Sequence, residues 1–176
     1  MSLFVVKSLI PDDVSKELEI NDKFLEQLLF NRGIKTKAEA EAFLKPSYDE
    51  QLHNPFLLHD MEKAVERILQ AVKANETIVI FSDYDCDGIP GAVVLHDFFK
   101  AIGYQNFHNY IPHRHYDGFG LSTKAVLSIK EKYNPALIIT IDCGTTDIEA
   151  VKQAKEQNIE VIITDHHEPK ENLPEA

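Results

Sequence analysis

Three groups of acidic and histidine side chains have residue types suited to holding a divalent cation. The first spells D-x-D-x-D-G and contains Asp83, Asp85 and Asp87, the second is Asp142-Cys143-Gly144, and the third is Asp165-His166-His167. Carboxylates and imidazoles without a thiolate cluster suit Mn²⁺ or Mg²⁺, with Zn²⁺ as an alternative. Because neighbouring ionised carboxylates repel one another, cations would stabilise such a cluster.

The first group begins like the calcium loop of an EF-hand. Such a loop needs a helix on each side and a bidentate glutamate at its twelfth position. Counting from Asp83, the twelfth residue is Val94, the eighth is Pro90, and the preceding residues 77–81 (TIVIF) have the composition of a strand. The sequence therefore excludes an EF-hand here.

The elements around these groups alternate between strands and helices. Apolar, β-branched runs at 77–81, 107–111, 137–141 and 160–164 predict strands, and the segments 90–102, 122–132 and 146–157 have helical patterns. Alternating strands and helices predict a parallel sheet. Continuous apolar strands are typical of a sheet buried on both faces. We therefore predict an α/β, Rossmann-like domain with helices on both faces.

This topology gathers the three groups at one place. Ligands of open parallel sheets bind outside the carboxyl ends of the strands, and the first, second and third groups follow the first, third and fourth predicted strands. Two cations about 3.5–4 Å apart could clamp a phosphoryl group there. Asp142, at the end of a central strand, is the expected bridging ligand.

The residues before this domain have helical patterns. Thr36 and Glu39 form a predicted capping box, and an apolar stripe predicts a longer helix over 60–74. We expect a helical N-terminal segment at 1–75 and the α/β domain at 76–176. Because the chain ends soon after its fourth predicted strand, we expect the domain to be cut short on its C-terminal side.

Composition limits the classes of protein. Hydrophobic residues make up 44% and charged residues 27% of the 176, which is ordinary globular usage. The net charge of −11 argues against DNA binding through overall charge. No apolar run of about 18 residues predicts a membrane span, and no secretory signal is recognisable. Cys86 and Cys143 are expected to be buried free thiols in a reducing cytoplasm.

The three groups together resemble the DHH phosphoesterase superfamily. Further motifs resemble the RecJ family of single-stranded-DNA exonucleases. They are Arg32-Gly33-Ile34, Phe43-Leu44-x-Pro46, Asn54-Pro55-Phe56-x-Leu58, Lys63-Ala64-Val65-x-Arg67-Ile68, Ile111-Pro112-x-Arg114 and Gly118-Phe119-Gly120-Leu121. The resemblance covers about residues 20 to 167.

The resemblance implies specific roles. The family's metal ligands fall on Asp85, Asp87, Asp142 and His166, with Asp83 beside them and His167 at the metal or the scissile phosphate. Asp142, His166 and His167 would be the catalytic residues, working with Mn²⁺ or Mg²⁺, as two ions. The implied activity is 5′-to-3′ hydrolysis of single-stranded DNA in repair and recombination, with DNA and repair proteins as partners and no membrane.

One further substrate contact is predicted from residue type. The guanidinium of Arg114 suits bidentate contact with a phosphate, and we expect it, with His167, to bind the substrate.

The chain departs from the family's usual pattern at Ser82, at Ile89-Pro90-Gly91 and at Thr145-Thr146-Asp147. A further Asp ligand, a second domain and a nucleic-acid-binding module of the family would all follow Ala176. Two alternatives stay open at this point. One is a DHH phosphodiesterase acting on short oligonucleotides or cyclic dinucleotides, and the other is a non-catalytic DNA-binding DHH relative.

Overall fold

The computed structural model describes residues 6–176, which form two compact units. One unit ends at Leu57 and the other runs from Leu58 to Ala176. The helix α5 (Met61–Ala74) lies in the second unit, although the predicted domain boundary at 75 would assign it to the N-terminal segment. The division into domains at residue 75 therefore stays a prediction.

The first unit is helical. Its core contains Leu18, Leu29 and Ala40. The predicted capping box is confirmed: the Thr36 hydroxyl accepts the Glu39 N–H, and the Glu39 carboxylate accepts the Thr36 N–H. The elements are α1 (Asp12–Leu18), α2 (Lys23–Asn31), α3 (Lys37–Leu44), α4 (Tyr48–Gln51) and a 3-10 turn at Pro55–Leu57.

The second unit confirms the predicted α/β fold. After α5 come β1 (Ile78–Ser82), α6 (Gly88–Ala101), β2 (Phe107–Tyr110), α7 (Thr123–Tyr133), β3 (Leu137–Ile141), α8 (Ile148–Glu156) and β4 (Glu160–Thr164). The strands form a parallel sheet in the order β2-β1-β3-β4. Within residues 6–176, no helix is long and apolar enough to cross a bilayer.

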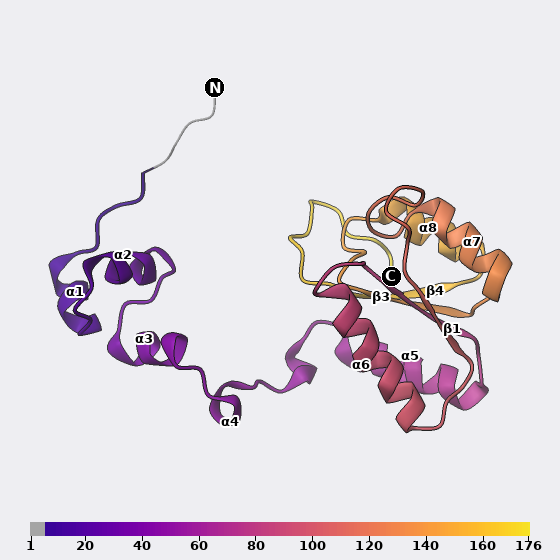
Figure 1. The fold of residues 1–176 in the computed structure, drawn as a ribbon, viewed down its shortest axis with the longest axis horizontal. Coiled ribbons are helices and arrows are strands. Elements are labelled where there is room, and N and C mark those ends of the chain that lie inside the picture. Colours follow the sequence, from indigo (N-terminus) through magenta and orange to yellow (C-terminus); the bar gives the residue numbers. More distant parts are fainter. Residues whose placement is uncertain (1–5) are drawn as a thin grey trace. The chain divides into compact units, whose positions relative to one another are not determined.

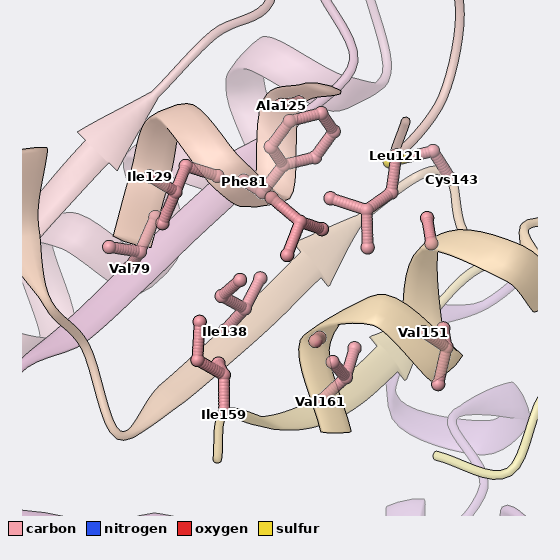
Figure 2. Packing of buried hydrophobic residues seen from close by; sticks show 13 residues of the cluster. Val79, Phe81, Leu121, Ala125, Ile129, Ile138, Cys143, Val151, Ile159 and Val161 are labelled. Carbon is pink, nitrogen blue, oxygen red and sulfur yellow. The ribbon is translucent and has the colours of Figure 1, made fainter. Parts of the chain in front are cut away.

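Helices cover both faces of this sheet, α5 and α6 on one and α7 and α8 on the other (Figure 1). Side chains alternate between the faces along β1: Ile78 and Ile80 pack towards α5 and α6, whereas Val79 and Phe81 pack towards α7 and α8. Figure 2 shows the second of these cores. Burial on both faces explains why the strands are continuous apolar runs.

The register of the sheet aligns the ends of three strands. Ser82 pairs with Ile141, and Ile141 pairs with Thr164. The next residue of each strand is Asp83, Asp142 or Asp165, so three aspartates leave the sheet side by side. The backbone ladder continues into the first two, because the Asp83 N–H donates to the Ile141 carbonyl at 3.1 Å and the Asp142 N–H donates to the Thr164 carbonyl at 2.8 Å.

Candidate metal centre

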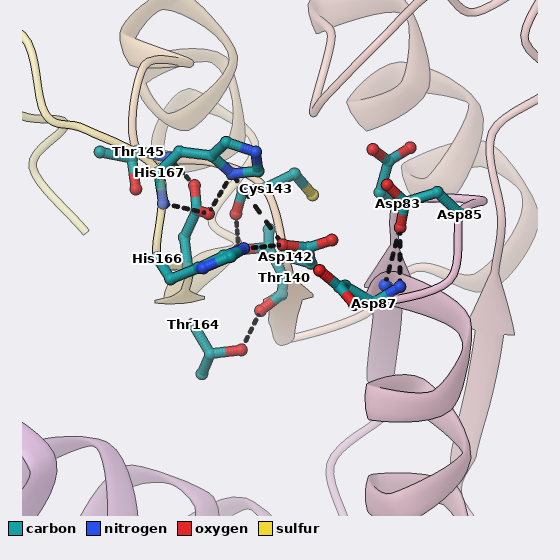
Figure 3. Close-up of polar contacts among 12 residues, drawn as sticks. Asp83, Asp85, Asp87, Thr140, Asp142, Cys143, Thr145, Thr164, His166 and His167 are labelled. Carbon is teal, nitrogen blue, oxygen red and sulfur yellow. Dashed lines mark hydrogen bonds and ion pairs between the residues drawn. The ribbon is translucent and has the colours of Figure 1, made fainter. Parts of the chain in front are cut away.

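The strand-end groups converge into two clusters of potential ligand atoms. One contains Asp83, Asp85 and Asp142, and the other contains Asp142, His166 and His167. The ligand atoms of each cluster all lie within 4.8 Å of one another. Figure 3 shows Asp142 between the aspartates of the β1 turn and the two histidines. The shared position of Asp142 is that of a ligand able to bridge two cations.

Asp142 is the buried member of the site. Its side chain is 7% exposed and its backbone has a φ of +60°, a left-handed conformation that aspartate tolerates better than most residues. Oδ1 lies 3.0 Å from His166 Nε2 as a potential ion pair, and among residues 6–176 this buried oxygen makes no hydrogen bond. Burial, and then the charge of Asp85, raise the pKa of the Asp142 carboxyl.

Because this buried carboxylate oxygen makes no hydrogen bond among residues 6–176, a cation beside it would compensate its charge. The surrounding donors are carboxylates and imidazoles, which suit a hard or borderline divalent cation such as Mn²⁺ or Mg²⁺. The residues present therefore fit the cofactor that the sequence predicts.

The β1 turn is shaped by its own carboxylates. Asp85 Oδ1 accepts the N–H groups of Asp87 at 3.0 Å and Gly88 at 3.1 Å, which closes the turn into α6. These two hydrogen bonds, the one from Gly88 foremost, lower the pKa of the Asp85 carboxyl. Asp83 Oδ1 similarly accepts the Tyr84 N–H at 2.7 Å. The turn therefore holds both carboxylates in fixed positions, with Asp85 ionised.

Asp87 takes a different position from its two neighbours. It is exposed and belongs to neither cluster. It lines a pocket beside the clusters together with Asp142, Thr164, Asp165 and His166. A larger pocket, of about 480 Å³, lies elsewhere, between α5, β4 and the C-terminal residues. The structure thus brings together Asp83, Asp85, Asp142, His166 and His167 and sets Asp87 at their margin. Their roles as ligands stay predictions.

Asp165 belongs to the site, but the sequence did not indicate its individual contacts. Its carboxylate accepts the Thr145 N–H at 3.0 Å and the His167 N–H at 3.1 Å, and it lies 2.7 Å from His167 Nδ1. Burial raises the pKa of the Asp165 carboxyl, but the hydrogen bonds with Thr145 and His167 outweigh it and hold this pKa well below its usual range. Asp165 therefore orients His167 and ties the histidine loop to the turn after β3. An aspartate side chain commonly accepts the backbone N–H two residues on, which is the signal for this turn.

The Asp165 contact also raises the pKa of His167 above its ordinary 6.5. We expect Asp165→Asn to lower the pKa of His167, because the amide cannot stabilise the imidazolium by charge. NMR titration of the histidine ring protons in a chelator measures this shift. An unchanged His167 titration in Asp165→Asn would contradict the contact, and the exposed Asp97→Asn is the matched control.

The sign of the pH effect on stability follows from the raised value. A histidine whose pKa is higher in the folded chain stabilises the fold below its unfolded pKa, and that stabilisation is lost as pH rises through the folded-state pKa. The metal-free chain should therefore lose this contribution from about pH 6.5 upwards.

Arg114 lies over two aromatic rings. Its guanidinium carbon is 5.1 Å from the centre of the Phe119 ring and 5.7 Å from that of Tyr84, and the two rings are 6.0 Å apart. Because Tyr84 lies between Asp83 and Asp85 in the chain, these contacts hold Arg114 next to the β1 turn. Arg114 and Phe119 are exposed, so both could meet a substrate.

The two cysteines differ. Cys143 is buried as predicted, and burial raises the pKa of its thiol. The expected burial of Cys86 is wrong: it is exposed, because it lies in the turn between Asp85 and Asp87, outside both cores.

Comparison with known proteins places this site in a family. A model of the DHH family, N-terminal domain, matches residues 77–176. The single-stranded-DNA-specific exonuclease RecJ of Bacillus subtilis is 42% identical over 150 residues, which are 85% of this chain and 19% of that protein. The enzyme of the same name from Haemophilus influenzae is 31% identical over 156 residues, 89% of this chain and 26% of that protein.

Solved structures agree. A crystal structure of an exonuclease RecJ bound to manganese has a TM-score of 0.61 and 32% identity, covering 66% of this chain and 30% of that one. RecJ from Thermus thermophilus in complex with Mn²⁺ also has a TM-score of 0.61, with 26% identity over 96% of this chain and 23% of that one. The chain thus spans about a fifth to a quarter of the curated relatives above, 19% and 26% of their lengths. With the family model matching the whole α/β sheet and the strand-end site, the chain belongs to the DHH family.

Proposed function

We propose that this chain carries the metal site of an exonuclease that hydrolyses single-stranded DNA from its 5′ end, in repair and recombination. Mn²⁺ or Mg²⁺, as two ions, would be the cofactor. The observation that carries the proposal is the buried Asp142, shared by the two clusters of ligand atoms. Relatives named as single-stranded-DNA-specific exonucleases, one of them 42% identical, support the substrate class.

In the proposed site, each cluster would hold one cation. Asp83 and Asp85 would hold the first, His166 and His167 the second, and Asp142 would bridge them. Bound cations would supply Lewis-acid neutralisation of the charge that develops on the phosphoryl oxygens. Asp87, at the margin of the clusters, would complete the coordination of the ions.

The remaining residues would orient the site and the substrate. Asp165 holds the ring of His167 through Nδ1, the ring nitrogen that also lies 3.9 Å from Asp142 Oδ1, and so would orient this ring at an ion or the scissile phosphate. Arg114, held over Phe119 and Tyr84, would bind a phosphate of the DNA with its planar guanidinium.

The test uses the chain with Mn²⁺ and a 5′-phosphorylated oligothymidylate labelled at its 3′ end. We expect mononucleotides to be released from the 5′ end, which is measured as progressive shortening of the 3′-labelled strand. A chelator should stop this shortening. Faster cleavage of a cyclic dinucleotide would favour the phosphodiesterase alternative. Binding of Mn²⁺ and DNA without cleavage would show that the site needs parts of the protein outside this chain or is non-catalytic, and a longer chain distinguishes these two.

Arg114→Ala should weaken oligothymidylate binding about tenfold or more, because a charge-assisted phosphate contact is worth about 1.5–3 kcal/mol. Mn²⁺ affinity should stay as in the wild type. Arg114→Lys keeps the charge but not the planar guanidinium, so its oligothymidylate affinity should lie between those of the wild type and Arg114→Ala. Fluorescence anisotropy measures the DNA affinity and calorimetry the Mn²⁺ affinity. Unchanged DNA binding in Arg114→Ala would contradict the phosphate-binding role of Arg114.

A further inference from the structure

Asp147 lies at the start of α8, five residues beyond Asp142, and the metal site does not account for it. Its carboxylate is half-buried and is directed at a different segment of the chain. Oδ2 accepts the backbone N–H of Leu121 at 2.7 Å. Leu121 ends the loop that follows β2, so this hydrogen bond joins that loop to the turn after β3.

The carboxylate makes this contact in place of a local one. An aspartate at the N-cap of a helix ordinarily accepts a backbone N–H of the first turn. In the part of the chain that the structure describes, Asp147 occupies the N-cap of α8 but its side chain caps no N–H of that helix. The Asp147 carboxylate therefore accepts the Leu121 N–H and does not cap its own helix.

Gly120 is matched to this carboxylate. Its φ is +67°, in the left-handed region that favours glycine. A Cβ at this position would lie 2.7 Å from Asp147 Oδ2 and 3.1 Å from Oδ1. The absence of a side chain at Gly120 is what lets the loop backbone approach the carboxylate.

The same loop also carries the residues that face the substrate in the proposed function. Arg114 and Phe119 contact Tyr84 of the β1 turn. Leu121, two residues after Phe119, is 2% exposed and packs in the core between the sheet, α7 and α8. The loop is thus fixed at Leu121, and Phe119 beside it contacts Tyr84 and Arg114, so the positions of Phe119 and Arg114 depend on how Leu121 is held.

We propose that Asp147 is a positioning residue, which holds the loop 112–121 through the Leu121 N–H so that Arg114 and Phe119 lie beside the metal site. This inference rests on the proposed function, because the loop matters only if it binds a substrate. Asp147 itself would touch neither DNA nor cation.

The experiment compares Asp147→Ala, Asp147→Asn and Asp147→Ser. Alanine removes the acceptor, asparagine keeps an acceptor oxygen of the same reach, and serine keeps a good N-cap residue that is too short to reach Leu121. Amide hydrogen exchange of Leu121 by NMR reports the hydrogen bond. Anisotropy of a phosphorothioate-linked oligothymidylate, which resists hydrolysis, reports substrate binding in Mn²⁺. Calorimetry reports Mn²⁺ binding.

In Asp147→Ala and Asp147→Ser we expect Leu121 to exchange about tenfold faster or more, as loss of a hydrogen bond to a charged acceptor implies. Oligothymidylate affinity should fall severalfold while Mn²⁺ affinity is unchanged. Asp147→Asn, which keeps a neutral acceptor, should lie closer to the wild type than the other two variants in both the exchange rate and the affinity, which a general loss of stability would not do. If the alanine variant does not fold, the serine variant provides the same comparison.

Unchanged Leu121 exchange in Asp147→Ala and Asp147→Ser would overturn the inference. So would faster exchange with unchanged oligothymidylate affinity, because the loop would then be loosened without consequence. A wild-type chain that binds Mn²⁺ but no oligothymidylate would contradict the proposed substrate and with it the positioning role. The exchange rates would still decide whether Asp147 holds the loop.

Discussion

Asp142→Asn is expected to lower the affinity for Mn²⁺ by more than the roughly 10–100-fold that loss of an outer-shell partner costs. Asp142 is the residue common to both clusters of ligand atoms, and its buried Oδ1 makes no hydrogen bond among residues 6–176. A neutral amide of the same shape cannot bridge two cations. Calorimetry should therefore show loss of both sites in the variant, whereas changing a ligand of one cluster should spare the other.

The same variant also tests whether the ionised Asp142 carboxylate destabilises the metal-free chain. Because burial and Asp85 raise the pKa of Asp142, its ionised form is unfavourable in the metal-free chain. Asp142→Asn should therefore melt at the same or a higher temperature than the wild type in chelator, and should lose the stabilisation that Mn²⁺ gives.

Asp97→Asn is the matched control for this change. It removes the same charge from an exposed position on α6 and should leave Mn²⁺ binding unaltered. Full two-ion binding by Asp142→Asn would remove Asp142 from the bridging role and with it the main support for the proposed function.

Gly88→Ala is expected to destabilise the chain by about 1–3 kcal/mol, as overpacking does. In the interior of an unconstrained helix, a change from glycine to alanine would be stabilising by about 1 kcal/mol. Here a Cβ on Gly88 would lie 2.5 Å from the carbonyl oxygen, 2.7 Å from the carbonyl carbon and 2.9 Å from the Cα of Asp83. All three are backbone atoms, so no rotation of a side chain relieves the contact.

The displaced backbone is that of the acidic turn. Gly88 also donates its N–H to Asp85 Oδ1, so its movement should shift Asp83 and Asp85 together and weaken Mn²⁺ binding. Tyrosine fluorescence during urea unfolding follows the effect on stability, since five of the six tyrosines lie beyond Leu58. Ile89→Ala, at the exposed neighbouring position, should change stability by about 0.5 kcal/mol or less. A Gly88→Ala chain as stable as the wild type would show that the turn yields without cost.

The sequence alone determined the sheet, the helices that cover it and the strand ends that carry the candidate metal ligands. Apolar β-branched runs separated by helical patterns have few other solutions, and β3 and β4 occupy the predicted residues 137–141 and 160–164. The convergence of Asp83, Asp142 and the two histidines followed from the topology, since the carboxyl ends of parallel strands lie at one edge.

Only the tertiary structure decided how individual carboxylates are used. The sequence presents Asp83, Asp85, Asp87, Asp147 and Asp165 as equivalent acids after strands, but an aspartate has several donors within reach. Asp85 closes its turn, Asp165 orients His167, and Asp147 reaches across to Leu121, 26 residues away. Which donor wins depends on where the packed elements place each backbone N–H, and residue type and spacing do not specify those distances.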